Sequence, residues 1–326
     1  MRFRSALPEV TPRTLGLWLL AIVGVGAIFT ALLVVLAGRG SVDLAPPTSE
    51  LISFAGVFPA EDEDALSGPL GIAAYGNQLY VAEADAGTVR VFRPNGALVA
   101  DILVPAQQAG STAYPSDLAV IDRGCIAVVE NTSQRVLVLD TDPDAEQPVL
   151  FVVGECDSTS PGHPTAVAYA QGELFVYDGV SHSIWVYSAE DGSLVREIGA
   201  NLKPALTFVG GLTLDDAGRL YVADTVSGRV IALDGVSGKQ LGVLPQTFSL
   251  PKGVSAGPDE TLMIVDTFAC MVTIADRAGD TLDSIGEESG LVDPRDAVWI
   301  SSDERVYVTD ASIGRILVFN VRLSDD

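Results

Sequence analysis

Four mostly apolar residues followed by a carboxylate recur six times along the chain. The apolar runs are rich in β-branched and aromatic residues and are too short for helices, so each one predicts a strand. Apolar residues on both faces are expected where every sheet is covered on both sides. The repeat length of about 45 residues is typical of a four-stranded propeller blade. The six segments are Leu79–Glu83, Ile126–Glu130, Leu174–Asp178, Leu220–Asp224, Leu262–Asp266 and Val306–Asp310.

A second strand and a proline repeat in phase with this motif. An aliphatic residue stands six positions after every carboxylate: Val89, Val136, Ile184, Val230, Val272 and Ile316. This constant offset indicates a turn of constant length, which keeps the strand register the same in each repeat. A proline precedes the predicted innermost strand in five repeats, and the fourth repeat has Phe208-Val-Gly210 instead. The innermost strands are expected to begin at Gly71, Asp117, Ala166, Gly211, Gly253 and Asp296.

This pattern resembles the NHL repeat. The match is closest at Gly71-Ile-Ala-Ala with Leu79-Tyr-Val-Ala-Glu83, and at Leu220-Tyr-Val-Ala-Asp224 with Arg229-Val. The resemblance covers residues 51–322. It implies an all-β fold, a six-bladed β-propeller of four-stranded antiparallel blades, whose surface binds other molecules.

The two ends of the repeat array are predicted to meet. After Ile316–Phe319 only seven residues remain, which is too few for a turn and an outer strand in the last blade. Leu51–Gly56 resembles the endings of the outer strands in other repeats. We expect this segment to complete the last blade, because a closed ring has no open sheet edges.

The N-terminal region is typical of a membrane anchor. Residues 15–37 carry no charge, and at about 1.5 Å rise per residue they reach across a ~30 Å hydrocarbon core. Three arginines and one glutamate precede this segment, so the positive-inside rule places the N-terminus in the cytoplasm. A cleaved signal peptide is the alternative, since Val35–Ala37 offers small residues to a peptidase. The predicted organisation is a cytoplasmic tail (1–13), a single transmembrane helix (14–37), a linker (38–50) and a propeller (51–322) outside the cytoplasm.

Charge and composition exclude several classes of function. The 326 residues include 43 acidic and 19 basic ones, a formal net charge of -24, and such a field repels nucleic acid. Two histidines and three cysteines exclude zinc modules, three-histidine metal centres and a disulfide-dense scaffold. The acidic balance predicts a basic or cation-bridged partner.

The strand-end carboxylates have two interpretations. Six carboxylates at equivalent positions could gather a cation. The favoured interpretation is structural: each accepts hydrogen bonds from backbone N–H groups of its turn, and an arginine five residues on pairs with it in repeats two, four and six. The residues concerned are Glu83, Glu130, Asp178, Asp224, Asp266 and Asp310.

The candidate binding residues are Asp117, His163 and Asp296, at the predicted mouth of the central channel. An Asp/His/Asp cluster there could polarise a water molecule or hold a divalent ion. Gluconolactonase-type propellers, which are a similar family, hold calcium with a glutamate and asparagines on their inner strands. The six expected starts of the inner strands have neither residue. Related amidating lyases need several histidines around zinc, more than this protein offers.

Two functions are therefore predicted, beside a third hypothesis of an assembly or stability factor whose helix contacts a membrane complex, and no catalytic residue is assigned. The first is a non-catalytic binding or scaffold module for a protein, peptide or glycan partner outside the cytoplasm, without a cofactor. The alternative is a metal-assisted hydrolase or lyase, similar to a lactonase, with a divalent cation at the channel mouth. A complete set of ligands facing the channel would favour the second.

Overall fold

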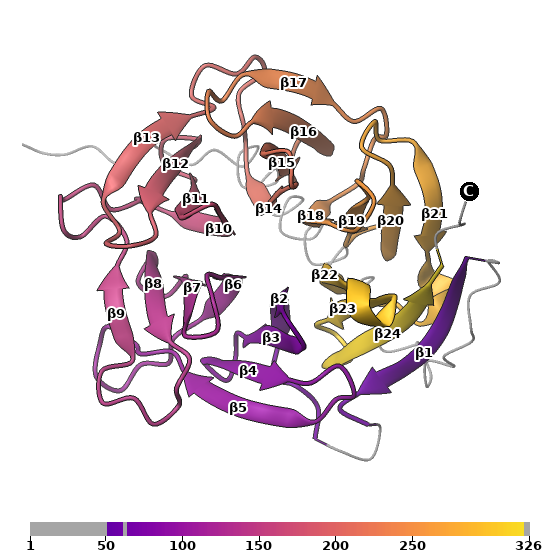
Figure 1. The fold of residues 1–326 in the computed structure, drawn as a ribbon, viewed down its shortest axis with the longest axis horizontal. Coiled ribbons are helices and arrows are strands. Elements are labelled where there is room, and N and C mark those ends of the chain that lie inside the picture. Colours follow the sequence, from indigo (N-terminus) through magenta and orange to yellow (C-terminus); the bar gives the residue numbers. More distant parts are fainter. Residues whose placement is uncertain (1–50, 61–63, 323–326) are drawn as a thin grey trace, which may run out of the picture. The chain divides into compact units, whose positions relative to one another are not determined.

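A computed structural model describes residues 51–60 and 64–322, all within the compact unit Ala45–Asp326. These residues form six four-stranded antiparallel sheets, arranged as blades around a central channel (Figure 1). The all-β six-bladed propeller predicted from the repeat is confirmed.

Each blade has four strands, which follow one another in order from the channel to the outer rim. The first three blades contain β2 (Pro69–Tyr75), β3 (Gln78–Glu83), β4 (Thr88–Phe92) and β5 (Leu98–Leu103); β6 (Pro115–Val120), β7 (Cys125–Glu130), β8 (Arg135–Asp140) and β9 (Val149–Val152); and β10 (Pro164–Ala170), β11 (Glu173–Asp178), β12 (Ser183–Ser188) and β13 (Leu194–Ile198).

The last three blades contain β14 (Val209–Leu214), β15 (Arg219–Asp224), β16 (Arg229–Asp234) and β17 (Gln240–Val243); β18 (Pro251–Ala256), β19 (Leu262–Asp266), β20 (Met271–Ala275) and β21 (Thr281–Ile285); and β22 (Pro294–Ile300), β23 (Arg305–Asp310), β24 (Arg315–Val321) and β1 (Ile52–Phe58). Two short 3₁₀ turns, η1 (Glu287–Ser289) and η2 (Ser301–Asp303), flank β22.

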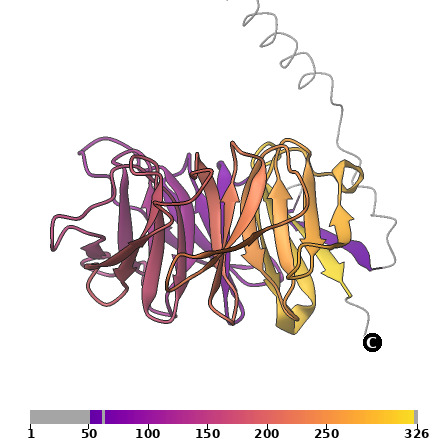
Figure 2. The ribbon, with the colours of Figure 1, turned by 90° about the horizontal axis from the view of Figure 1, so that it is seen from above.

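The innermost strands β2, β6, β10, β14, β18 and β22 contact one another in sequence, and β22 contacts β2 to complete the ring. All six begin at the same end of the channel, because every blade repeats the same strand order around the ring, which Figure 2 shows from the side. We call this end the mouth, and the surface around it the mouth face. The turns that follow the strand-end carboxylates lie on the mouth face too, because each second strand is antiparallel to its innermost strand.

The ring is closed by β1, which pairs with β24 from Ile52 opposite Val321 to Phe58 opposite Ile316. The closing strand predicted at Leu51–Gly56 is therefore present and extends two residues further. Phe58 also reaches the first blade, where its ring lies 5.5 Å from that of Phe92.

The core lies between blades, because each sheet buries both of its faces. The second strands are almost fully buried, and the tyrosines at their centres, such as Tyr80, Tyr221 and Tyr307, are at most 1% exposed. Side chains of neighbouring blades form shared apolar clusters, for example Tyr177 and Ile184 with Leu220 and Val222. The double apolar pattern of the repeat follows from this packing.

A bulge disrupts the register at the start of every innermost strand, as between Pro164 and Ala166 or Pro251 and Gly253. The proline that begins five of these strands has no N–H and suits a strand's first position. A bulge leaves one residue unpaired and redirects its side chain. In this ring the bulged residues line the channel.

The predicted cytoplasmic tail (1–13), membrane anchor (14–37) and linker (38–50) lie outside the described residues. Among the residues that are described, no helix is long and apolar enough to cross a membrane. The anchor and the location outside the cytoplasm stay predictions from the sequence.

Candidate functional site

The strand-end carboxylates are buried in the turns of the mouth face, where each is at most 2% exposed. They accept hydrogen bonds from the loop before the innermost strand and from their own turn. Asp178 Oδ1 accepts the His163 N–H at 2.7 Å, and its Oδ2 accepts the Ser181 N–H at 3.0 Å. Asp310 accepts the N–H groups of Val292 and Asp293 at 2.7 and 3.0 Å. These contacts tie the first two strands of each blade together.

Arginines pair with several of these carboxylates. Arg229 lies 2.8 Å from Asp224, and Arg135 lies 3.4 Å from Glu130, both five residues after their partners. Within residues 51–60 and 64–322, no three histidine, cysteine or acidic side chains come close enough to hold one metal ion. Neither the carboxylate ring nor the predicted Asp117, His163 and Asp296 cluster forms such a site there.

The channel contains a cavity of about 480 Å³, a size typical of small-ligand sites. Its walls are the innermost strands, and all six bulged residues line it. Going round the ring from the first blade to the sixth, these are Leu70, Ser116, Thr165, Gly210, Lys252 and Arg295.

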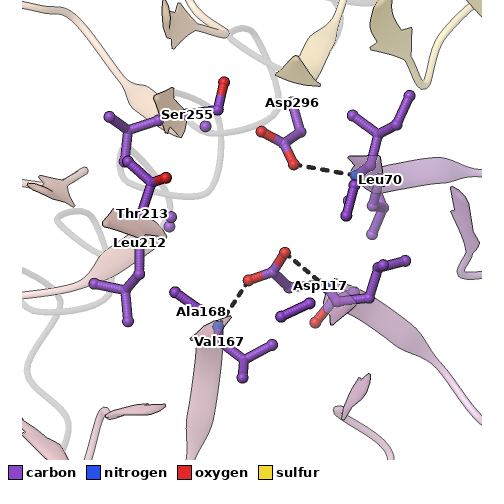
Figure 3. Close-up of a pocket in the computed structure, with 18 of the residues that line it drawn as sticks. Leu70, Asp117, Val167, Ala168, Leu212, Thr213, Ser255 and Asp296 are labelled. Carbon is purple, nitrogen blue, oxygen red and sulfur yellow. Dashed lines mark hydrogen bonds between the residues drawn. The ribbon is translucent and has the colours of Figure 1, made fainter. Parts of the chain in front are cut away.

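Asp117 and Asp296 project into this cavity, one on each side of β2 (Figure 3). Each carboxylate bridges to the innermost strand of the next blade. Asp117 Oδ2 accepts the Val167 N–H at 2.8 Å, and Asp296 Oδ2 accepts the Ile72 N–H at 3.1 Å. The two residues predicted from the sequence thus hold neighbouring blades together and also face the cavity.

Glycines make room for both carboxylates. A Cβ atom on Gly253 would lie 2.5 Å from Asp296 Oδ1, and one on Gly71 would lie 2.9 Å from the Asp117 Cα. In each case the glycine occupies the position of the preceding blade that matches the aspartate. A larger residue there would force the two innermost strands apart.

Burial disfavours the charged form of both carboxyl groups. It raises the pKa of Asp117 to about 7, against the lowering effect of hydrogen bonds from Val167 and Leu118. Burial, with the nearby charge of Asp117, raises the pKa of Asp296 well above its usual range. The pair therefore carries less than its full charge at neutral pH.

The raised pKa of Asp117 predicts a pH-dependent stability. The folded pKa exceeds that of the unfolded chain, so this contribution is fully present below about pH 4 and is lost as the pH rises through about 7. Between about pH 5 and pH 8, the free energy of unfolding of the wild type should fall by roughly 2–3 kcal/mol relative to Asp117→Asn.

Urea unfolding of both proteins at several pH values measures this change. The substituted asparagine would lose a backbone hydrogen bond at every pH, which lowers its free energy of unfolding by a constant amount. The test is therefore how the difference in free energy between the two proteins changes with pH, and not its absolute size. Asp144→Asn, at an exposed position, is the matched control. Parallel pH profiles for the wild type and Asp117→Asn would contradict the prediction.

His163 lines the same cavity, but within the described residues it does not join Asp117 and Asp296 in a cluster that could hold a metal ion. It precedes Pro164, whereas the aspartates come two positions after their prolines, so the three residues are not equivalent in the repeat. Its backbone joins the turn: the N–H donates to Asp178, and the carbonyl accepts the Gly179 N–H at 2.8 Å.

Sequence reasoning missed the cations of the mouth. Lys252 and Arg295 are the bulged residues of two adjacent blades and both line the cavity. The Lys252 ammonium lies 5.2 Å from the centre of the Phe208 ring, and Arg295 pairs with Asp293 at 2.6 Å. A comparison of the residue that follows the initial proline of each repeat would have shown that Lys252 and Arg295 occupy equivalent positions.

No protein-family model and no curated protein sequence matches this protein. Solved structures with a similar fold include a protein of unknown function from Bacteroides thetaiotaomicron, with 15% identity, a TM-score of 0.62, and coverage of 80% of this protein and 71% of that one. A streptogramin B lyase has 14% identity and a TM-score of 0.57, covering 84% of this protein and 89% of its own length. A component of a nidogen/laminin complex has 18% identity and a TM-score of 0.54, covering 68% and 81%.

At these identities the similarity is one of fold. The fold and the cavity together define a six-bladed β-propeller with a central site at its mouth. The NHL family stays a prediction from the repeat.

Proposed function

We propose that this protein is a non-catalytic binding module of the NHL type, which holds a segment of a partner protein on its mouth face. The observation that carries the proposal is an arc of exposed apolar side chains there. Val180, Val226 and Phe268 are 69%, 69% and 78% exposed. Each is the second residue after a strand-end carboxylate, in blades three, four and five. We call these three residues the apolar arc.

The arc is specific to one side of the ring. The equivalent positions in blades six, one and two are Ser312, Asp85 and Thr132, which are polar. The turns have the same length in all blades, so nothing in the backbone requires apolar residues in three of them. Adjacent exposed apolar side chains indicate an interaction surface, since water solvates them poorly.

The arrangement of the cavity supports binding over the metal-assisted alternative. A hydrolase or lyase of that kind needs several ligands around one ion. In the described part of the protein, Asp117 and Asp296 bond to backbone N–H groups of neighbouring blades, and no third ligand joins them.

Photocrosslinking in intact cells tests the proposal. Benzoylphenylalanine at position 268 of the full-length protein should give a discrete adduct of higher mass. Adding Val180→Ser and Val226→Ser should reduce that adduct about 30-fold, because truncating central contacts costs about 2 kcal/mol or more.

Position 236 provides the control. Val236 is 74% exposed in the turn between β16 and β17, on the face opposite the mouth. Benzoylphenylalanine there should give no such adduct. Equal amounts of adduct from positions 268 and 236 would contradict the proposal. So would an amount of adduct at position 268 that the serine substitutions do not change.

A further inference from the structure

We infer that the mouth of the cavity binds a single carboxylate of the ligand through Lys252 and Arg295. This inference rests on the proposed binding function and names the chemical group that the site recognises. Its basis is the position, pairing and surroundings of the two cations.

Lys252 is a half-buried cation without an ion pair. The protein has three lysines and a net charge of -24, so acidic partners are abundant. Of the ion pairs formed within the described residues, none includes Lys252. Its contact is with the face of Phe208, and such a contact compensates only part of the cost of burying an ammonium group.

Arg295 adds a second positive charge beside it. Burial, and then the charge of Arg295, lower the pKa of Lys252. Asp293 balances Arg295 through one terminal nitrogen, while the buried Nε of Arg295 has no hydrogen-bond partner in the described region. Lys252 therefore has no acidic partner in direct contact, and Arg295 has a donor without an acceptor within the described residues.

A third donor, Ser116, lines the same cavity on the side of the ring opposite Lys252. Ser116 is the bulged residue of the second blade, and the second and fifth blades are opposite in a ring of six. Its hydroxyl is buried and has no partner among the described residues. Between Ser116 and Lys252 the fourth blade contributes Gly210, where a Cβ atom would lie 2.9 Å from the Lys252 carbonyl oxygen.

These features match a monoanion with an apolar body. The unpaired ammonium of Lys252 can pair with one carboxylate, whereas the net charge of -24 on the protein opposes a multiply charged ligand. Phe208 offers an aromatic surface beside the ammonium. Below them, the raised pKa values of Asp117 and Asp296 limit the negative charge that the carboxylate meets. The carboxylate can come from the C-terminus of a polypeptide or from an acidic side chain.

Three small probes distinguish these sources by calorimetric titration of the full-length protein. N-acetylphenylalanine presents a C-terminal carboxylate, and N-acetylphenylalaninamide is its neutral match. The α-amide of N-acetylaspartic acid presents only the carboxylate of a side chain. We expect at least one acid to bind about tenfold or more tightly than the neutral amide, since hydrogen bonds to charged groups contribute most to such a site. The tighter acid identifies the source.

Lys252→Met should remove this preference, and Lys239→Met should leave it unchanged. Lys239 is exposed in the turn between β16 and β17, away from the mouth. The wild-type protein alone shows whether an acid binds more tightly than the neutral amide. This comparison therefore tests the inference even if Lys252→Met does not fold. Equal binding of acids and amide, no binding of either acid, tighter binding of inorganic phosphate, or an unchanged preference in Lys252→Met would overturn the inference.

The probes need no partner protein. Loss of the acid preference with an intact arc-dependent adduct at position 268 would reject the carboxylate site alone. Loss of the adduct with a retained acid preference would reject the protein-binding function alone.

Discussion

Replacing Ile52–Phe58 by a glycine-serine segment of equal length should abolish the cooperative thermal unfolding of the propeller. The replacement removes two buried anchors, since Ile52 is 0% exposed and Phe58 is 7% exposed. Truncating a buried isoleucine or phenylalanine costs about 2–5 kcal/mol. The two together approach the whole stability of a typical domain, which is about 5–15 kcal/mol. Circular dichroism during heating measures the transition.

The large effect follows from the double role of β1. It supplies the outer strand of the sixth blade, and without it β24 would expose an open edge. Phe58 also packs 6.2 Å from Tyr307 in that blade and against Phe92 in the first blade. The strand therefore joins the beginning of the ring to its end.

Ala55→Ser is the matched control for this replacement. Ala55 is exposed within β1, so its substitution should leave the melting temperature unchanged. A replaced strand that unfolds like the wild type would show that the ring is stable without its closing strand.

Asp224→Ala should lower the free energy of unfolding by about 3–5 kcal/mol, the usual effect of leaving a buried charge without its partner. Asp224 is 0% exposed. It accepts the Thr207 hydroxyl at 2.6 Å and the Thr207 N–H at 3.1 Å, and it pairs with Arg229 at 2.8 Å. The variant leaves the Arg229 guanidinium without its acidic partner, although it keeps the carbonyl oxygens of Pro204 and Ala205, and it removes the acceptor of the Thr207 donors. Urea unfolding near pH 7 measures the loss.

The control for Asp224→Ala is Asp216→Ala, an exposed aspartate of the same blade, which should change stability little. Crosslinking at position 268 provides the second measurement. A variant that melts normally but loses the crosslinked adduct would show that Asp224 acts in binding and not in holding its turn.

The repeat made most of the fold predictable, because its signals are local. Each strand-end carboxylate and the aliphatic residue six positions later lie on two adjacent strands of one hairpin. A turn of fixed length sets that register through short-range contacts. The closing strand was predictable for the same reason, since Leu51–Gly56 has the pattern of an outer strand. Its exact extent depended on Phe58 reaching another blade.

The candidate site was predictable only in part. Asp117 and Asp296 stand at equivalent positions of two repeats, and both face the cavity as the pattern suggested. His163 is displaced from them because it stands before the bulge and they stand after it. Lys252 and Arg295 each follow a proline, and the local sequence carries no signal of their role, because the bulge is what directs them to the channel.

The sequence by itself determined the class of fold, the number of blades and the strand that closes the ring, because these depend on periodic patterns within each repeat. The tertiary structure alone decided which side chains meet at the mouth. Ser116, Lys252 and Arg295 belong to three different blades, and they face one cavity because ring closure and the bulges direct them to it. The apolar arc has the same origin, since equivalent turns of successive blades become neighbours on one face only when the blades are arranged around a common axis.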